Sequence, residues 1–238
     1  MTSLLRLLTF NASIQPERYP PTLDPDVYDP IIRREIITSF LVAAGVDLDL
    51  ICLQGFVPGD FKGVLRLLPS FHGLISSRSG CALLARRTSF DSIHFEDRDG
   101  VVRVRAVPTG TDHPIQIWSV DLTEETMRKF EPGPQIVSGT FPSKLLEAQG
   151  LIDALRKVGN FEPTRPFDQA PAIGDHLFVQ DLKPVSGDVD DRISSRGSNG
   201  HLWSIQSEAR RIEAVLNSYG SDHLPIRALV RVGANSSE

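Results

Sequence analysis

The sequence predicts an α/β fold in which two β-sheets are covered by helices. The 238-residue chain opens with an apolar strand, an amphipathic helix and a second apolar strand. Many short apolar runs follow, separated by turn residues and by a few helical segments. No repeat or linker divides the chain, and its length is enough for one core without disulfides or a structural metal. We therefore expect a single domain over residues 1–238, with its helices packed on two sheets.

The first segments predict a strand, a loop and a helix. Leu4–Phe10 is apolar and predicts a buried strand that ends at Asn11. Residues 12–30 combine prolines with Asp and Tyr, which predicts a long loop, either a surface connection or a wall of a binding cleft. Ile31–Ala44 predicts an amphipathic helix that ends at Gly45. Its expected buried face is Ile32, Ile36, Ile37, Phe40 and Leu41, and its expected polar face is Arg33, Arg34 and Glu35.

The rest of the chain alternates strands with short helices. The expected strands are Leu48–Gln54, Phe71–Ser76, Cys81–Arg86, Ser92–Phe95, Val101–Val107, Ile115–Leu122, Gln135–Ser138, Ala172–Gln180 and Arg227–Val232. The expected helices are Phe61–Leu68, Leu145–Val158 and Glu208–Asn217. Residues 186–200 are rich in Asp, Ser, Arg and Gly, which predicts a mobile loop.

Composition limits the classes of partner and compartment. The formal net charge of -5 excludes a basic surface over the whole protein, so a polyanion would need a local basic patch or a bound metal. Cys52 and Cys81 have no metal-ligand spacing and suit a reducing compartment. Leu4–Phe10 is too short for a signal sequence and contains Arg6, and no stretch reaches membrane-spanning length. We expect an intracellular protein, cytoplasmic or nuclear, without a membrane span.

The loop before the last strand contains the most reactive pair of side chains. Asp222 and His223 are adjacent, and such a pair can supply a carboxylate and an imidazole to one pocket for acid, base or electrophilic roles. The alternative is structural, with Ser221 and Asp222 capping a turn and His223 half buried. The other motifs of the chain decide between these interpretations.

The order of short motifs resembles the endonuclease/exonuclease/phosphatase superfamily. The matching segments are Leu8–Asn11 for its first strand, Asp49–Gln54 for its second, Gly80–Arg86 for its Gly-x-Ala strand, Trp118–Leu122 for the strand that usually ends in His-Leu, Ser138–Ser143 for Gly-Asp-Phe-Asn, Gly174–Val179 for Ile-Asp-His-Ile-Phe-Val, and Ser221–Pro225 for the terminal Ser-Asp-His-x-Pro. The resemblance covers nearly the whole chain. It implies a four-layer α/β sandwich, with two mixed β-sheets packed face to face and flanked by helices, and metal-dependent hydrolysis of phosphoesters.

The resemblance also implies roles for individual residues. Asn11, Asp175, Asp222 and His223 match catalytic positions of the family pattern. Asp175 would hold the imidazole of His223 in one tautomer, and Asp222 would lie near the metal. The expected substrate contacts are His176 and Arg78, with Arg86 and Arg87 as further cations able to meet a phosphate.

Several family positions are replaced in this chain. Gly55 stands where a metal-binding Glu is expected, and Asp121 stands where the His of His-Leu is expected. Thr140 replaces the Asp of Gly-Asp-Phe-Asn, and Pro142 replaces its Asn. Glycine and proline side chains offer no ligand, and threonine is neutral where a carboxylate would orient the attacking water. Any Mg²⁺ or Mn²⁺ site should therefore bind its ion weakly.

Three hypotheses follow from the sequence. The first is a phosphoester hydrolase of the phosphodiesterase, nuclease or phosphatase lineage, with a rearranged site in which Asp121 and Asp222 hold the metal. The second is a catalytically inactive pseudoenzyme that binds a phosphorylated small molecule, a nucleic acid or a protein partner. In the third, Asp175, His176, Asp222 and His223 only form a hydrogen-bonded structural network, and Asp121 only caps a turn.

Overall fold

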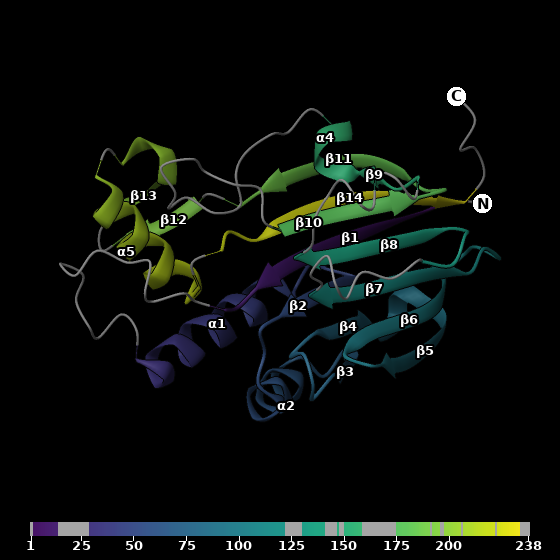
Figure 1. Cartoon of the computed structure of the whole chain (residues 1–238), viewed down its shortest axis with the longest axis horizontal. Coiled ribbons are helices and arrows are strands. Elements are labelled where there is room, and N and C mark those ends of the chain that lie inside the picture. Colours follow the sequence, from purple (N-terminus) through teal and green to yellow (C-terminus); the bar gives the residue numbers. More distant parts are fainter. Residues whose placement is uncertain are drawn as a thin grey trace.

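A computed structural model describes residues 2–13, 29–121, 130–140, 147, 150–158, 175–190, 192–195, 198–205, 207–221 and 223–233. Two six-stranded sheets pack face to face, with helices against the outer face of the first sheet (Figure 1). Both sheets mix parallel and antiparallel neighbours. The predicted α/β sandwich of two mixed sheets is therefore confirmed.

The first sheet is built around the N-terminal strand. Strand β1 pairs in parallel with β2 and antiparallel with β14, so the first and last strands of the chain lie side by side. In spatial order the strands are β11 (Lys183–Val189), β14 (Ile226–Gly233), β1 (Thr2–Asn11), β2 (Leu50–Gln54), β4 (Ala82–Arg86) and β3 (Phe71–Ile75). All of β2 and most of β1 is buried, which explains why both read as continuous apolar runs rather than alternating ones.

The second sheet follows the middle of the chain. Its strands β7 and β8 are parallel, and its other neighbours are antiparallel. In spatial order the strands are β5 (Phe90–Arg98), β6 (Val101–Pro108), β7 (Ile115–Asp121), β8 (Gln135–Thr140), β10 (Asp175–Gln180) and β9 (Ile152–Asp153). A separate two-stranded ribbon joins β12 (Arg192–Ser195) to β13 (Ser198–His201).

Three helices pack against the outer face of the first sheet, and together they form one hydrophobic core with it. They are α1 (Pro30–Ala44), α2 (Pro58–Leu67) and α5 (Glu208–Tyr219). A second core fills the space between the sheets, and a third lies on the outer face of the second sheet around Trp118 and Phe178. The short helix α4 (Ala154–Lys157) and two single 3-10 turns, Arg87–Ser89 and Leu202–Ser204, complete the helical segments described. No described helix is long and apolar enough to cross a membrane.

Helix α1 differs from its prediction at its first turn. Asp29 caps the helix by accepting hydrogen bonds from the backbone amides of Ile31 and Ile32, and Pro30 suits the first helical position. The prediction that Ile32 is buried is wrong, because its side chain is 44% exposed. Arg33, predicted on the polar face, is instead partly buried. Periodicity cannot detect this difference, because it does not show that polar acceptors lie beneath Arg33.

Two further predictions of local structure are wrong. The expected helix Leu145–Val158 is interrupted at Gly150, where a turn with a φ of 80° leads into β9. Asp153 then caps α4 with its carboxylate, which accepts from the amides of Leu155 and Arg156. The expected mobile loop 186–200 contains most of β11 and both strands of the ribbon. Of the expected loop 12–30, residues 14–28 lie outside the described residues.

Candidate functional site

Polar side chains from both sheets meet at one end of the sandwich. Strands β1 and β8 run toward this end and finish at Asn11 and Thr140. Strands β10 and β14 start there, so Asp175 and the loop carrying His223 lie at the same end, opposite to the chain termini (Figure 1). Asp175 is the direct neighbour of Thr140 in the antiparallel pairing of β10 with β8. The topology therefore gathers residues that are far apart in the sequence.

These four side chains form a continuous hydrogen-bonded group, which we call the Asn11–Thr140–Asp175–His223 cluster. Nδ1 of His223 lies 2.5 Å from Oδ2 of Asp175. The other carboxylate oxygen accepts a hydrogen bond from the Thr140 hydroxyl at 2.6 Å and lies 3.5 Å from Nδ2 of Asn11. Nδ2 of Asn11 also donates to the Thr140 hydroxyl at 2.9 Å. The Asp175 carboxylate is thus the acceptor at the centre of the group.

The cluster is enclosed. The exposed fractions are 0% for His223, 2% for Asp175 and 4% for Asn11. The contact of the carboxylate with Nδ1 fixes the orientation of the His223 ring. Sequence reasoning brought Asn11, Asp175 and His223 to one site, and the structure places them together. It treated Thr140 only as a lost carboxylate and missed its place in the group.

A second layer of hydrogen bonds joins the loops that carry the cluster. The hydroxyl of Ser221 lies 2.6 Å from the carbonyl oxygen of Asn11 and 2.8 Å from that of Ser13. It also accepts from the amide of His223 at 3.2 Å. Ser13 returns two bonds to Oδ1 of Asn11, from its amide at 3.0 Å and its hydroxyl at 2.7 Å. Ser221 therefore holds the end of β1 against the loop before β14, as its predicted turn-capping role suggests in part.

Arg33 of α1 makes a related connection. Its Nε donates to the carbonyl of Gly220 at 2.8 Å, and its Nη2 donates to the carbonyl of Ala12 at 2.9 Å. Ala12 follows Asn11, and Gly220 precedes Ser221, so one guanidinium group holds both loops of the cluster. The sequence pattern carried no signal for this role.

At the position where the family pattern has a metal-binding Glu, the backbone conformation and the close neighbours favour glycine. Gly55 has a φ of 69°, which side chains rarely adopt. A Cβ atom there would lie 2.9 Å from the amide nitrogen of Ser13. At the Gly-Asp-Phe-Asn position, Gly139 is also required, since a Cβ atom would lie 1.8 Å from the carbonyl oxygen of Val120. Within the described residues, no group of three or more His, Cys, Asp or Glu side chains is arranged to hold a metal ion. These residues do not fit the metal site that the resemblance implies.

Asp121 lies at the same end of the second sheet. It ends β7, its direct neighbour on β8 is Thr140, and its side chain is exposed. Its negative charge acts on Cys81, where burial is the main cause that raises the thiol pKa to about 12 and Asp121 adds to the increase. Asp222 and Pro142 lie outside the described residues, so the predicted pairing of Asp121 with Asp222 stays a prediction.

The structure places the remaining predicted contacts away from the cluster. His176 follows Asp175 on β10 and points to the other face, where Nδ1 lies 3.4 Å from Oδ2 of Asp153. Arg78 is exposed and pairs with Asp99 at 3.3 Å. Arg86 donates to the carbonyls of Leu48 and Val46 at 2.7 and 2.8 Å, beyond the opposite ends of the strands. Arg87 lies in the 3-10 turn that follows it.

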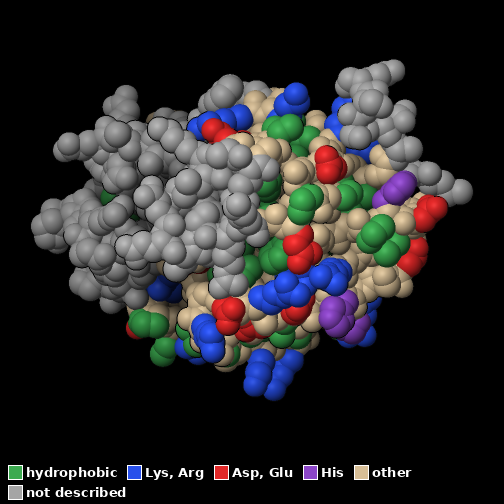
Figure 2. Space-filling view, turned by 45° about the vertical axis from the view of Figure 1, so that its right-hand side comes forward, with side chains coloured by type: hydrophobic (Ala, Val, Ile, Leu, Met, Phe, Trp, Pro, Cys, Tyr) green, Lys and Arg blue, Asp and Glu red, His purple; other side chains and the backbone are tan. Residues whose placement is uncertain are grey.

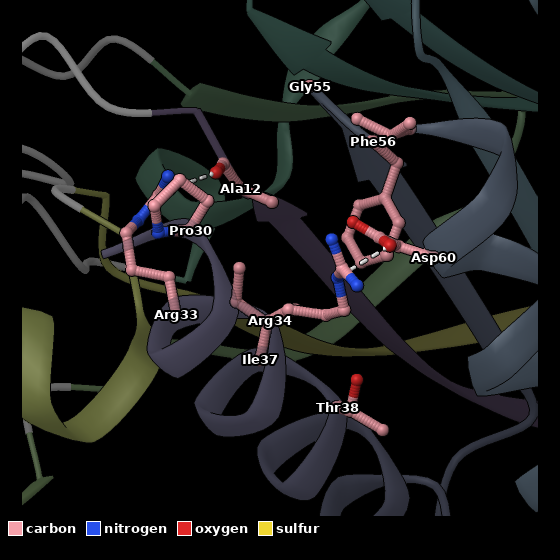
Figure 3. Close-up of a pocket in the computed structure, with 10 residues that line it drawn as sticks. Ala12, Pro30, Arg33, Arg34, Ile37, Thr38, Gly55, Phe56 and Asp60 are labelled. Carbon is pink, nitrogen blue, oxygen red and sulfur yellow. Dashed lines mark hydrogen bonds and ion pairs between the residues drawn. The ribbon is translucent and has the colours of Figure 1, made fainter. Parts of the chain in front are cut away.

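The surface also bears on the partners of the protein. On the face shown in Figure 2, Lys and Arg side chains are interspersed with Asp and Glu, and the described residues form no continuous basic area on that face. Behind the cluster, a pocket of about 200 Å³ opens between α1 and the start of α2 (Figure 3). Ala12 and Gly55 are two of its walls, so the pocket adjoins the ends of β1 and β2.

No protein-family model matches the chain, and no curated protein matches it in sequence. Several solved structures are similar to it. An endonuclease/exonuclease/phosphatase protein from Bacteroides vulgatus is 14% identical, with a TM-score of 0.64 over 96% of this chain and 98% of the other. TDP2 from D. rerio, complexed with a single-strand DNA product, is 12% identical, with a TM-score of 0.58 over 97% and 100%.

A third similar structure is ANGEL2, a 2′,3′-cyclic phosphatase, in complex with adenosine-2′,3′-vanadate. It is 13% identical, with a TM-score of 0.62 over 97% of this chain and 96% of the other. These likenesses show that the chain has the fold of the endonuclease/exonuclease/phosphatase superfamily, as the resemblance implied. At such identities they show the fold alone.

Proposed function

We propose that the protein is a hydrolase-like phosphoester-binding protein of this lineage in which metal-dependent hydrolysis has been lost. The ligand is a phosphorylated small molecule or nucleic acid, contacted by the Asn11–Thr140–Asp175–His223 cluster. The observation that carries the loss of hydrolysis is Gly55. Its left-handed conformation and its closeness to Ser13 leave no space for the carboxylate that the family pattern uses.

The cluster is suited to recognition of a phosphate oxygen. The Asp175 carboxylate orients the ring of His223, so Nε2 is the group that would donate to the ligand. Asn11 and Thr140 hold the carboxylate in place. Because His223 is fully enclosed, ligand contact requires local opening around it. Hydrolysis would further need a group that orients water, and Thr140 is neutral and already bonded to Asp175.

One observation favours the second candidate, a hydrolase with a rearranged site. Asp121, Thr140 and Asp175 stand in register on three adjacent strands, so two carboxylates flank the position where the family places one. Asp121 is exposed and free of the backbone constraint that acts at Gly55. Together with Asp222, it would hold Mg²⁺ or Mn²⁺.

Hydrolysis assays separate the two candidates. The substrates are bis(p-nitrophenyl) phosphate, single- and double-stranded DNA, RNA and soluble phosphoinositides, each with Mg²⁺ or Mn²⁺. We expect the natural protein to show no turnover above a His223→Ala variant, and to bind a nucleoside monophosphate more tightly than this variant does. Metal-dependent turnover that His223→Ala abolishes would overturn the proposal, and Asp121→Ala would then test the rearranged site.

A restored variant tests the position assignments. It carries Gly55→Glu, Thr140→Asp and Pro142→Asn. The structure predicts that Gly55→Glu requires Ser13 to shift, and that Thr140→Asp places a second carboxylate against Asp175. We therefore expect a less stable protein, and its folding should be checked by circular dichroism before its activity is measured.

The two cysteines are buried and unpaired, which supports our proposal of an intracellular setting.

A further inference from the structure

The pocket behind the cluster contains two neighbouring arginines with different environments. Both guanidinium groups of Arg33 and Arg34 reach it from the first turns of α1 (Figure 3). Arg33 is bonded to the carbonyls of Ala12 and Gly220 and serves as part of the wall. Arg34 extends across the pocket to Asp60, where its Nε lies 2.7 Å from Oδ1. Among the described residues, Nη1 and Nη2 of Arg34 have no acceptor.

Asp60 orients Arg34 without filling the pocket. The ion pair with Asp60 lies on the Nε edge of the planar guanidinium, so the two Nη groups remain available to a ligand. The side chain of Arg34 is 53% exposed, so a ligand from solvent can reach it. Counting Arg33, Arg34 and Asp60, the charged side chains that line the pocket carry one net positive charge. Such a forked donor suits the oxygens of a phosphate group.

The pocket and the cluster share their walls. Ala12 donates its amide to the carbonyl of Gln54 at 2.9 Å, which joins the segments after β1 and β2. On the other side of these segments lies Asn11, whose Oδ1 would be 3.3 Å from a Cβ atom on Gly55. The pocket volume of about 200 Å³ is many times the roughly 10–15 Å³ that one water needs on the same measure, so it has room for a phosphate group and part of its carrier. It does not hold an extended polymer.

We infer that this pocket is an oxyanion site that binds a second phosphate group of the ligand, with Arg34 as its main donor. The first phosphate group is the one that contacts His223 in the proposed function, and to that extent this inference rests on that function. Together, the two sites predict that the ligand is a small molecule carrying two phosphates.

The test follows amide chemical shifts by NMR during titration with inorganic phosphate. In the natural protein we expect saturable shifts at Ala12, Gly55 and Val57. Arg34→Gln should weaken this binding by about tenfold or more, because it removes charge-assisted hydrogen bonds. Asp60→Asn keeps the size of the side chain and removes the negative charge beside Arg34, so it should bind phosphate more tightly.

The matched control is Arg66→Gln, which removes the same charge from an exposed position in the last turn of α2. It should bind as the natural protein does. Equal weakening by Arg34→Gln and Arg66→Gln would show only a general charge effect and would overturn the inference. Absent shifts at the pocket, or an unchanged or lower affinity in Asp60→Asn, would also overturn it.

The ligand class is tested by comparing a nucleoside 3′,5′-bisphosphate with the 5′-monophosphate. We expect tighter binding of the bisphosphate, and loss of that advantage in Arg34→Gln. No advantage for the bisphosphate would overturn the two-phosphate ligand. The His223→Ala variant separates the two proposals, because phosphate should still shift the pocket amides in it. If the bisphosphate changes the amide chemical shifts of the pocket residues but not that of His223 in the natural protein, the proposed function is contradicted. The oxyanion site would still be supported by that result.

Discussion

Two of the buried groups that contain charged side chains are assembled in different ways. On the outer face of the second sheet, Arg103 is 1% exposed and bonds to Glu96, its direct neighbour across β5 and β6. Gln116 on the adjacent strand accepts from Arg103 at 3.2 Å, and the ring of Trp118 lies 5.0 Å from its guanidinium carbon. The Asn11–Thr140–Asp175–His223 cluster instead draws on both sheets and on residues separated by up to 212 positions.

This difference teaches what a buried polar group indicates. The surroundings of Arg103 follow from the register of three consecutive strands, and its group is complete without any ligand. Strand register explains only the contact of Asp175 with Thr140 in the cluster. Asn11 and His223 are brought to that contact by the closed fold, at strand ends that adjoin a pocket. Long-range convergence of polar side chains is therefore the stronger indication of a functional site than burial alone.

The largest expected effect comes from Asp175→Ala. This change leaves the buried side chains of His223 and Asn11, and the half-buried side chain of Thr140, without their common acceptor. Breaking a buried pair by removing one partner costs about 3–5 kcal/mol. Urea denaturation should therefore show a decrease of that size in the free energy of unfolding. A decrease below about 1 kcal/mol would mean that the cluster relaxes easily, contrary to the enclosed geometry.

A smaller loss is expected for Arg103→Ala, about 2 kcal/mol, from the lost bonds to Glu96 and the lost contact with Trp118. The Glu96 carboxylate that remains is partly exposed and can be hydrated. The control is Arg105→Ala, whose exposed side chain lies 3.7 Å from Glu131 and should change stability by no more than about 0.5 kcal/mol. If both variants lose a similar free energy of unfolding, the burial of Arg103 adds nothing to the stability that its ion pairs provide.

The ion pair of Arg103 with Glu96 makes a pH-dependent contribution to stability. Hydrogen bonds from Arg103, and then from Arg98, lower the pKa of Glu96 from 4.5 to about 2. Because the folded-state pKa is depressed, this contribution to stability is fully present above pH 4.5 and is lost as the pH falls toward 2. Glu96→Gln should therefore be less stable than the natural protein at neutral pH, and the difference should shrink over this window. Denaturation midpoints between pH 2 and 6 measure it, and a difference that stays constant would contradict the assignment.

Much of the fold could be predicted because the central strands are buried on both faces. β1, β2 and β7 read as apolar runs, and the helices α1, α2 and α5 follow from periodicity. The failures lie where the backbone decides the structure. β11 is an edge strand with few apolar residues, so its composition resembles a loop. It is held by pairing with β14, with a register shift between Pro184 and Ser186.

The site could be predicted only as far as the ordered motifs extend. They brought Asn11, Asp175 and His223 together, although each is common in isolation. They could not show that Thr140 donates to Asp175, or that Arg33 holds both loops, because these contacts depend on the packing of α1 and β8. Nor could they show that Gly55 is required by its backbone conformation.

The smallest expected effect uses the two cysteines, which lie in the core between the sheets. Burial raises the pKa of Cys52 and of Cys81 to about 12, so neither thiol reacts in the folded protein near pH 8. Both cysteines lie in the core between the sheets, next to the face of β8 that carries the cluster, whereas Arg103 acts on the opposite face of the same sheet. When urea is adjusted so that both variants have equal global stability, Asp175→Ala should label faster with a thiol reagent than Arg103→Ala. The reason is that loss of the cluster opens the end of β8 locally, while loss of Arg103 weakens a face that the cysteines do not touch. Equal labelling rates would mean that both groups stabilise only the whole fold, and the distinction between them would then rest on ligand binding alone.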